Sequence, residues 1–383
     1  MIRIVDKSAC CGCSACFNLC PQKCISMEND KMGFMYPSVD MEKCVGCGLC
    51  ENICPSLKKG TIGENVRLIT YAAQNPNDVI RQSSSSGGIF TSLAQYILSQ
   101  NGVVFGAAFD RTFRKVQHVA VQTSQDLYRI QGSKYVQSNA GCSYRTVKEF
   151  LEQGRLVLFS GTLCQVAGLQ AFLHKDYQNL YLIDVVCYGV PAPKVWDAYI
   201  DSLEKKYNGR VTKVSFRDKR NGWNDYVISV KFDNGKEYVN CRSDDPYMRG
   251  FLHDCYLRPA CYQCEFKGLN RASDITLGDL WGIDHIAPKL NDDKGTSLVM
   301  ISSERGKLLF EKVLSDMIFQ MVKIKEVVKY NPAIEANIHT GQNNIAFEKD
   351  FGNKPITALL NQYCSKSVIK KLIQKIRTAM KHR

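Results

Sequence analysis

A duplicated cysteine run near the N-terminus constrains this chain more than any other feature. Two segments share the spacing C-x2-C-x2-C-x3-C-P, and the second begins 34 positions after the first. Ten of the 18 cysteines fall within the first 54 of 383 residues. A small cysteine-dense segment indicates either a disulfide framework or metal ligation. The cysteines of the repeat are Cys10, Cys13, Cys16 and Cys20, followed by Cys44, Cys47, Cys50 and Cys54.

The compartment decides between disulfides and metal. The opening residues, MIRIVDKSACCGC, contain no long apolar stretch of the kind that directs export. We therefore expect a cytoplasmic, reducing location, where disulfides are disfavoured and metal ligation is favoured. No apolar run approaches 18 residues, so we expect no transmembrane helix.

The spacing of the repeat is that of bacterial ferredoxins with two [4Fe–4S] clusters, in which the fourth cysteine of each run ligates the other run's cluster. Zinc is the alternative, because thiolates at this spacing also suit a tetrahedral ion, but a duplicated three-plus-one pattern has no simple zinc interpretation. Cys11 and Cys24 fall outside the pattern, as packed thiols or replacement ligands. The predicted sets are Cys10, Cys13, Cys16 and Cys54 for the first cluster, and Cys44, Cys47, Cys50 and Cys20 for the second.

The net charge of +13 is concentrated at the C-terminus. Residues 351–383 contain eight Lys and Arg and no Asp or Glu, which leaves +5 for the rest of the chain. This distribution, with no recognition-helix or RNA-binding motif, argues against nucleic acid as a partner. Within the tail, five apolar side chains fall on one helical face: Ile369, Leu372, Ile373, Ile376 and Met380. Such a helix either packs on the body or makes peripheral contact with an anionic membrane or a partner.

Helix and strand patterns alternate through the body, whose length suits one or two further domains. The segment RQSSSSGG precedes a helical pattern from Ile89 to about Ile97, with Gly102 suited to its end, and VVFGAAF then indicates a buried strand. A serine–glycine cluster that opens a helix is either an anion-binding loop or an ordinary N-cap.

A second unit brings further cysteines together. The runs 156–160 and 180–187 are strand-like and flank a helical stretch, which predicts a right-handed parallel crossover. Cys164 and Cys187 then follow the carboxyl ends of neighbouring strands, where open α/β sheets build their sites. With the closely spaced pair Cys261 and Cys264, they form either a third four-thiolate site or a set of buried thiols. Asp274 and Asp279 flank the strand-like run ITLG as turn residues, hydroxyl acceptors or surface charges.

The order of these motifs carries a family resemblance from about residue 1 to 305. The ferredoxin repeat is followed by SSSSGGIFTSLA, GSKYVQS, FSGTLCQVAGL, VCYGVPAP, SFRDKRNGW, LRPACYQCEFK and ASDITLGDLWG. In this order they resemble the coenzyme F-420 hydrogenase/dehydrogenase beta-subunit family. The resemblance implies an α+β fold: a small bacterial-type dicluster ferredoxin domain, then a mixed α/β flavin-binding domain with FAD and its own [4Fe–4S] cluster.

The resemblance also implies site residues. It makes Cys164, Cys187, Cys261 and Cys264 the ligands of a third [4Fe–4S] cluster, with Cys255 as the second-ranked substitute for Cys187. Leu163 stands where the family usually has proline, which relaxes the loop and leaves the ligand in place. The residues expected around the flavin are Ser86, Gly87, Gly88, Ser133, Lys134, Tyr135 and Ser138.

The expected function is an FAD- and iron–sulfur-dependent oxidoreductase. Electrons would pass from a ferredoxin-like donor or a partner oxidoreductase subunit through three [4Fe–4S] clusters to FAD, and as a hydride to a small-molecule acceptor such as a deazaflavin. The alternative is a non-catalytic subunit that relays electrons to a partner enzyme. No dinucleotide fingerprint, Walker loop or HExxH motif is present, so direct NAD(P)H use has no sequence support.

We predict five regions from these patterns. They are a ferredoxin domain (1–58), a linker (59–69), an N-terminal flavin-binding region (70–150), a C-terminal α/β domain with the third cluster site (151–330) and a basic tail (331–383).

Overall fold

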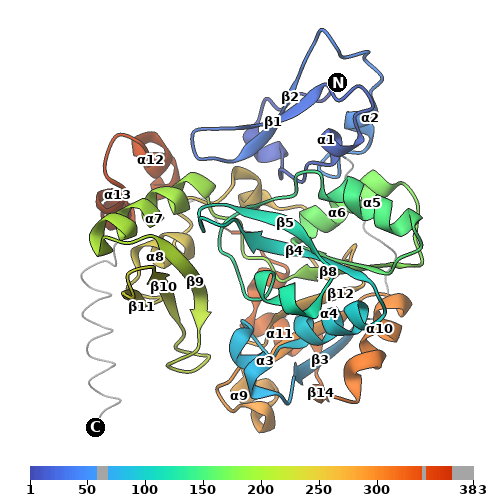
Figure 1. The fold of residues 1–383 in the computed structure, drawn as a ribbon, viewed down its shortest axis with the longest axis vertical. Coiled ribbons are helices and arrows are strands. Elements are labelled where there is room, and N and C mark those ends of the chain that lie inside the picture. Colours follow the sequence, from blue (N-terminus) through green and yellow to red (C-terminus); the bar gives the residue numbers. More distant parts are fainter. Residues whose placement is uncertain (58–67, 339–341, 365–383) are drawn as a thin grey trace.

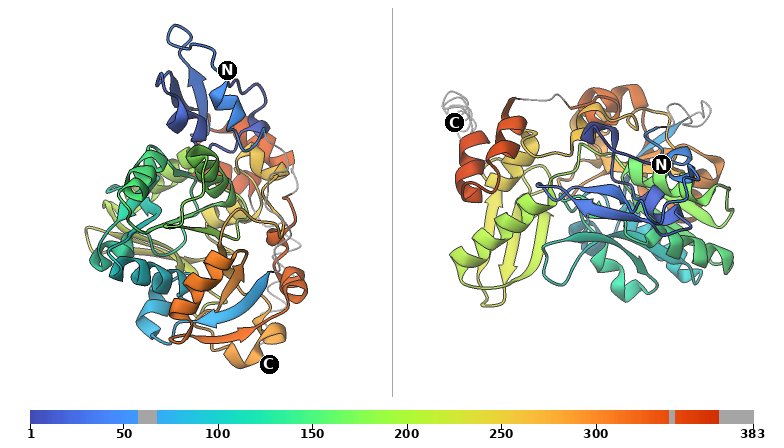
Figure 2. Two further views of the ribbon diagram at one scale, coloured as in Figure 1. Left: turned by 90° about the vertical axis from the view of Figure 1, so that its right-hand side faces the viewer. Right: turned by 90° about the horizontal axis from the view of Figure 1, so that it is seen from above.

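The computed structural model describes residues 1–57, 68–338 and 342–364 (Figure 1). Most of the predicted linker, and the predicted amphipathic helix from Ile369 to Met380, lie outside the described residues. The N-terminal segment lies at the top of a larger body both in Figure 1 and in the left view of Figure 2, which is turned by 90°. Within the described part of the chain, no helix is both long and apolar enough to cross a membrane.

The N-terminal segment is built around one hairpin and two short helices. Strand β1 pairs antiparallel with β2, with Ile25 opposite Val39. The Asp30 carboxylate fixes the hairpin turn by accepting hydrogen bonds from the backbone N–H groups of Met32 and Phe34, both at 2.9 Å. This hairpin lies between the two cysteine runs. The elements are η1 (Lys7–Ala9), α1 (Ala15–Leu19), β1 (Ile25–Asn29), β2 (Met35–Val39) and α2 (Leu49–Asn52).

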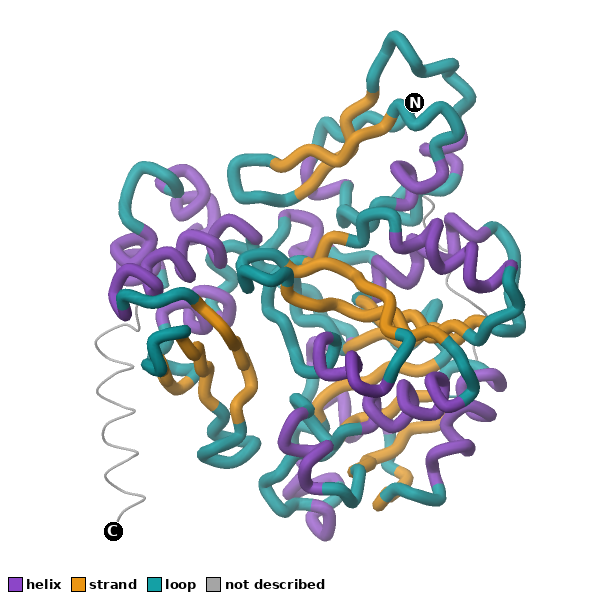
Figure 3. The backbone as a smooth tube through the Cα atoms, viewed as in Figure 1, coloured by secondary structure: helices purple, strands orange, loops and turns teal. Residues whose placement is uncertain are grey.

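A nine-stranded mixed sheet forms the core of the body (Figure 3). Its order is β14-β3-β13-β12-β8-β7-β4-β5-β6, and the four central strands β12, β8, β7 and β4 are mutually parallel. The strands are β3 (Ile69–Gln74), β4 (Val103–Phe109), β5 (Val116–Val121), β6 (Ser138–Asn139), β7 (Val157–Gly161), β8 (Leu180–Val185), β12 (Ile275–Asp279), β13 (Ser297–Ile301) and β14 (Ile318–Met321).

The predicted strand–helix–strand unit is confirmed as β7–α6–β8. Strands β7 and β8 are parallel neighbours, with Gly161 opposite Asp184. Helix α6 (Leu163–Leu173) begins with a capping box, in which the Thr162 side chain and the Gln165 side chain each bond the other's backbone. This cap fixes the point at which the chain leaves the sheet, directly before Cys164.

Helices cover both faces of the large sheet. Helices α4 (Ile89–Ser99) and α10 (Glu304–Leu314) pack on one face, and α5 (Ser143–Glu152) and α6 pack on the other. The predicted helix over 89–97 is confirmed, but Asn101, with φ of 56°, takes the left-handed conformation at its end instead of Gly102. Asparagine tolerates this conformation better than most residues other than glycine, which explains the difference.

A second, smaller sheet lies to the side of the body, seen at the left of Figure 1. It is antiparallel with order β11-β10-β9, and it shares a core rich in aromatic residues with α7 and the C-terminal helices. The elements are α7 (Pro193–Tyr207), β9 (Val211–Asp218), β10 (Val227–Phe232), β11 (Glu237–Cys241), α8 (Pro246–Leu252), α12 (Gln342–Asp350) and α13 (Ile356–Tyr363). The remaining helices are α3 (Asp78–Ser83), η2 (Ser124–Arg129), η3 (Pro259–Gln263), α9 (Ile283–Ile286), η4 (Pro288–Leu290), α11 (Ile324–Tyr330) and η5 (Pro332–Ile334).

Candidate functional site

The first predicted thiol set gathers where the N-terminal segment meets the body. The Cys16 thiol lies near the thiols of Cys10 and Cys54, so the structure brings the remote fourth cysteine of the second run to the first run. Burial raises the pKa of the Cys16 thiol to about 12 and that of Cys10 to about 11. Because burial disfavours a thiolate, these sulfurs become anionic only beside a compensating cation such as iron.

The second predicted set lies at the outer end of the N-terminal segment. Cys20, Cys44, Cys47 and Cys50 line one small apolar hollow, and Cys47 is exposed. Cys24, which the repeat does not include, lines the same hollow, with its sulfur 3.4 Å from that of Cys20. The structure therefore places Cys24 beside the predicted ligands without giving it a separate site.

The four cysteines predicted for a third cluster come from three separate parts of the body. Cys164 is the second residue of α6, and Cys187 follows the end of β8 by two residues. Cys261 lies in η3 and Cys264 directly after it. The Cys187 thiol has those of Cys261 and Cys264 as neighbours, and the Cys164 thiol has that of Cys264. Burial raises the pKa of the Cys261 thiol to about 11.

Cys11 and Cys255 have different surroundings. The thiol of Cys11 interacts with those of Cys13 and Cys164, so it lies between the first predicted set and the third. Cys255 is buried, with its sulfur 2.8 Å from that of Cys364. The structure thus gives Cys255 a packing environment and keeps Cys187 beside Cys261 and Cys264.

The three predicted sets offer sulfur donors alone, which suit iron–sulfur clusters as well as zinc. Among the described residues, no group of three or more Cys, His, Asp or Glu side chains is arranged to hold a single metal ion.

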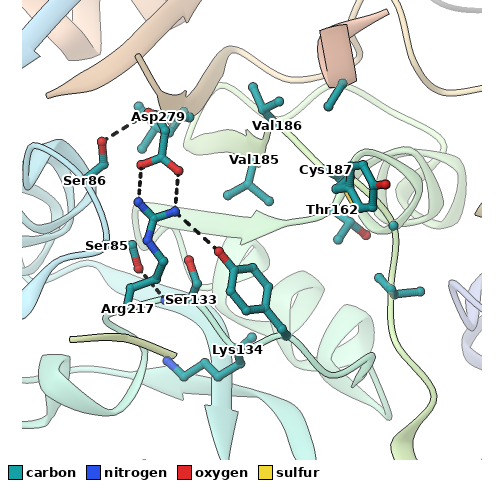
Figure 4. Close-up of a pocket in the computed structure, with 18 of the residues that line it drawn as sticks. Ser85, Ser86, Ser133, Lys134, Thr162, Val185, Val186, Cys187, Arg217 and Asp279 are labelled. Atoms are coloured by element: carbon teal, nitrogen blue, oxygen red, sulfur yellow. Dashed lines mark hydrogen bonds and ion pairs between the residues drawn. The ribbon is translucent and has the colours of Figure 1, made fainter. Parts of the chain in front are cut away.

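A cavity of about 770 Å³ opens beside the third thiol set at the carboxyl ends of the central strands (Figure 4). This volume lies within the usual range for cofactor sites. Of the seven residues expected around the flavin, six line the cavity. They are Ser86, Gly88, Ser133, Lys134, Tyr135 and Ser138. Gly87 faces the sheet instead, where its N–H donates to the Ser297 hydroxyl at 2.9 Å.

Loops from distant parts of the chain hold this cavity in shape. Ser85 accepts a hydrogen bond from the backbone N–H of Ser133 at 2.7 Å, which ties the SSSSGG loop to the GSKYVQS loop. Lys219 donates to three backbone carbonyls, including that of Ser86 at 2.7 Å. Loss of solvation lowers the pKa of Lys219 to about 7.

A buried ion pair forms one wall of the cavity. The sequence did not predict this pairing. The Arg217 guanidinium donates to both carboxylate oxygens of Asp279, at 2.7 and 3.1 Å, as Figure 4 shows. The guanidinium also lies 4.1 Å from the Tyr226 ring centroid. Asp279 is therefore neither a turn residue nor a surface charge. The two residues are 62 positions apart, and no local pattern links them.

Two more titratable groups line the cavity. Lys134 donates to the Gln131 carbonyl at 2.7 Å, and loss of solvation lowers its pKa to about 7. His118 stacks on Phe159, and its ring nitrogens lie 3.0 Å from the Ser160 carbonyl and 3.2 Å from the Ser138 hydroxyl. Burial lowers the pKa of His118 to about 4, so its ring is neutral at pH 7.

Cys187 joins the cavity to the thiols, because it lines the cavity and neighbours Cys261 and Cys264. From there, Cys164 leads through Cys11 to Cys13 of the first predicted set. A ligand in the cavity would therefore adjoin a line of buried sulfurs that reaches the N-terminal segment.

Comparisons with known proteins assign these regions to families. Residues 9–57 match the 4Fe-4S dicluster domain. Residues 70–141 and 154–327 match the N-terminal and C-terminal parts, respectively, of the coenzyme F420 hydrogenase/dehydrogenase beta subunit. One similar solved chain belongs to the F420-reducing [NiFe] hydrogenase complex from Methanosarcina barkeri, with 16% identity and a TM-score of 0.48, covering 78% of this chain and 96% of that chain. The search of curated proteins found no match.

Proposed function

Because the chain belongs to the coenzyme F420 hydrogenase/dehydrogenase beta-subunit family and carries a 4Fe–4S dicluster domain, we propose that it is an iron–sulfur flavoprotein oxidoreductase. In this proposal a ferredoxin-like donor or a partner subunit delivers electrons to the dicluster domain. They reach FAD by way of a third [4Fe–4S] cluster, and a small-molecule acceptor takes up a hydride. A deazaflavin is the acceptor that the family name suggests.

One observation carries this proposal: the thiols form a continuous line from the dicluster domain to the cavity. Cys13 adjoins Cys11, Cys11 adjoins Cys164, and Cys187 reaches the cavity. A dicluster domain that only relayed electrons to another protein would need no such line through the body. The arrangement therefore favours an acceptor bound within this chain over the non-catalytic relay.

The cavity suits a flavin nucleotide in its donors as well as its volume. FAD, when bound, takes up electrons singly and releases them as a pair. Lys134 would pair with its phosphates, since this side chain has no carboxylate partner among the described residues. Serine hydroxyls and the N-terminal end of α4 at Gly88 supply further donors. Arg217 and Asp279 would orient the bound group from the cavity wall.

Anaerobic purification followed by a visible spectrum tests the proposal. We expect flavin absorption together with iron–sulfur absorption, and FAD in the supernatant after heat denaturation. Reduced methyl viologen, used as the one-electron donor, should bleach the flavin band. A chain that carries iron but no flavin would contradict the enzyme and support the relay.

Variants then test the line of thiols. Cys187→Ser should slow bleaching of the flavin strongly while FAD stays bound, because this thiol joins the third set to the cavity. Cys142→Ser is the matched control, since Cys142 is exposed and belongs to none of the three sets. Equal bleaching rates in the two variants would exclude Cys187 from the path.

A further inference from the structure

Arg258 is an unusual buried cation at the boundary between the dicluster domain and the body. It lies directly before η3, the turn that carries Cys261, and its side chain is almost fully enclosed. Its guanidinium donates to the Cys10 carbonyl at 2.7 Å and to the Met35 carbonyl at 2.9 Å, both in the dicluster domain. A further bond reaches the Gln137 side chain at 3.0 Å.

The guanidinium also faces a sulfur of the first predicted set. One of its nitrogens lies 3.7 Å from the Cys10 sulfur. The rest of the group stacks 4.3 Å from the Tyr36 ring centroid and packs against the backbone of Gly12. A Cβ on Gly12 would approach the guanidinium to 2.8 Å, so this position requires glycine.

Among the hydrogen bonds that the structure describes for Arg258, none goes to a carboxylate. Burial of an uncompensated guanidinium is costly, and such groups are normally paired with an anion. The neutral oxygens around Arg258 offset part of this cost. The remaining candidate for a counter-charge is the Cys10 sulfur, which becomes a thiolate when it ligates iron.

We propose that Arg258 is a positioning residue that raises the reduction potential of the first [4Fe–4S] cluster and holds it against the body. Each electron that enters a cluster adds one negative charge, and a guanidinium beside a ligand sulfur stabilises that charge. The residue also ties the Cys10 loop to the turn that carries Cys261. The inference rests on the proposed function only through the first cluster, and it requires neither FAD nor a third cluster.

Arg145 offers a matched control at the same boundary. It too joins the body to the dicluster domain, donating to the carbonyls of Asn18 at 2.8 Å and Phe17 at 2.7 Å. It stacks 5.2 Å from the Phe17 ring centroid. Among the contacts that the structure describes for Arg145, none is to a cysteine sulfur. Its removal therefore weakens docking without removing a charge from beside Cys10.

The test is an anaerobic redox titration of the full iron-loaded chain, followed by EPR, for Arg258→Gln and Arg145→Gln. In Arg258→Gln we expect one cluster to become about tenfold harder to reduce, a shift of about 59 mV for a one-electron couple. The other midpoints, and all midpoints of Arg145→Gln, should stay at wild-type values. An unmoved midpoint in Arg258→Gln with full iron would overturn the proposal, as would an equal shift in Arg145→Gln.

Arg258→Lys covers the case in which Arg258→Gln loses iron. Lysine keeps the positive charge but not the planar fork, so a near-wild-type midpoint with full iron would support the proposal. If Arg258→Gln and Arg258→Lys both lose the first cluster while Arg145→Gln keeps full iron, the role of Arg258 is purely structural. That result would overturn the proposal. Iron content and reduction midpoints can be measured without flavin. The result is therefore independent of whether the proposed flavoenzyme function is correct.

Discussion

Single residues in the cavity carry charges whose state depends on what the cavity holds. Loss of solvation brings the pKa of Lys134 to about 7, so in the free protein about half of these side chains are neutral at neutral pH. An anion bound beside the amine would favour the protonated form. Flavin affinity and the protonation of Lys134 are therefore linked.

We predict that wild-type affinity for FAD weakens as the pH rises from 6 to 8.5. Above pH 7 the Lys134 amine is mostly neutral and cannot form a charge-assisted hydrogen bond to phosphate. FAD then binds strongly only if the amine takes up a proton, which becomes less favourable as the pH rises. Lys134→Met should weaken binding about 10- to 100-fold at pH 6, the value of one charged hydrogen bond, and should flatten the pH dependence. Fluorescence titration of the deflavinated protein measures both the affinity and its pH dependence, with Lys148→Met, whose side chain is exposed on α5, as the control. Unchanged affinity in Lys134→Met would place the phosphates elsewhere.

The pair of Arg217 and Asp279 makes a second prediction at this scale. Asp279→Ala leaves a buried guanidinium without its partner, which should lower the free energy of unfolding by about 3 kcal/mol. The double variant Arg217→Met/Asp279→Leu should lose less free energy of unfolding than Asp279→Ala alone, because no unpaired charge remains. Urea unfolding followed by circular dichroism measures the three proteins. A double variant less stable than the single one would mean that packing, not charge, explains the effect.

At the scale of elements, local sequence patterns predicted what local interactions determine. Helix α4 and the unit β7–α6–β8 follow from residue periodicity, turn residues and strand length. The contacts between elements could not be predicted in this way. Cys11 falls outside the spacing of the repeat, and docking of α1 on α6 brings it to Cys164. Arg217 in β9 and Asp279 at the end of β12 likewise meet only in the folded chain, because their strands belong to different sheets.

Helix α6 illustrates how a contact between elements overrides helix propensity. Gly168 lies in the middle of this helix, where alanine is ordinarily better by about 1 kcal/mol. A Cβ there would lie 2.8 Å from the Cys13 Cβ and 3.0 Å from its sulfur. The glycine thus allows the first cysteine loop to sit directly on the helix.

We therefore predict that Gly168→Ala destabilises the protein, contrary to helix propensity. The added methyl should push the Cys13 loop away from α6 and reduce the iron bound by the dicluster domain, by up to about half. Iron analysis and a thermal unfolding scan of the anaerobic protein check this. A variant with full iron and a raised unfolding temperature would show that the loop yields to the methyl group without loss.

At the scale of the whole molecule, the dicluster domain is docked on the body by contacts along one continuous boundary. The Asn18 side chain donates to the Gly141 carbonyl at 2.8 Å, and the Gln137 side chain donates to the Cys11 carbonyl at 3.2 Å. Arg258 and Arg145 add their bonds to these. Such docking fixes the separation between the first thiol set and the third, and electron transfer requires a fixed, short separation. The bounds of the five predicted regions themselves stay predictions.

The central claim is that three clusters, not two, lead to the cavity, and the iron content tests it most directly. Wild-type protein purified anaerobically should contain about twelve irons per chain, and Cys261→Ser/Cys264→Ser about eight, because only the third thiol set is lost. Cys142→Ser/Cys241→Ser, which changes two cysteines outside all three sets, should keep about twelve. About eight irons in the wild type, or equal iron in the wild type and Cys261→Ser/Cys264→Ser, would contradict the account.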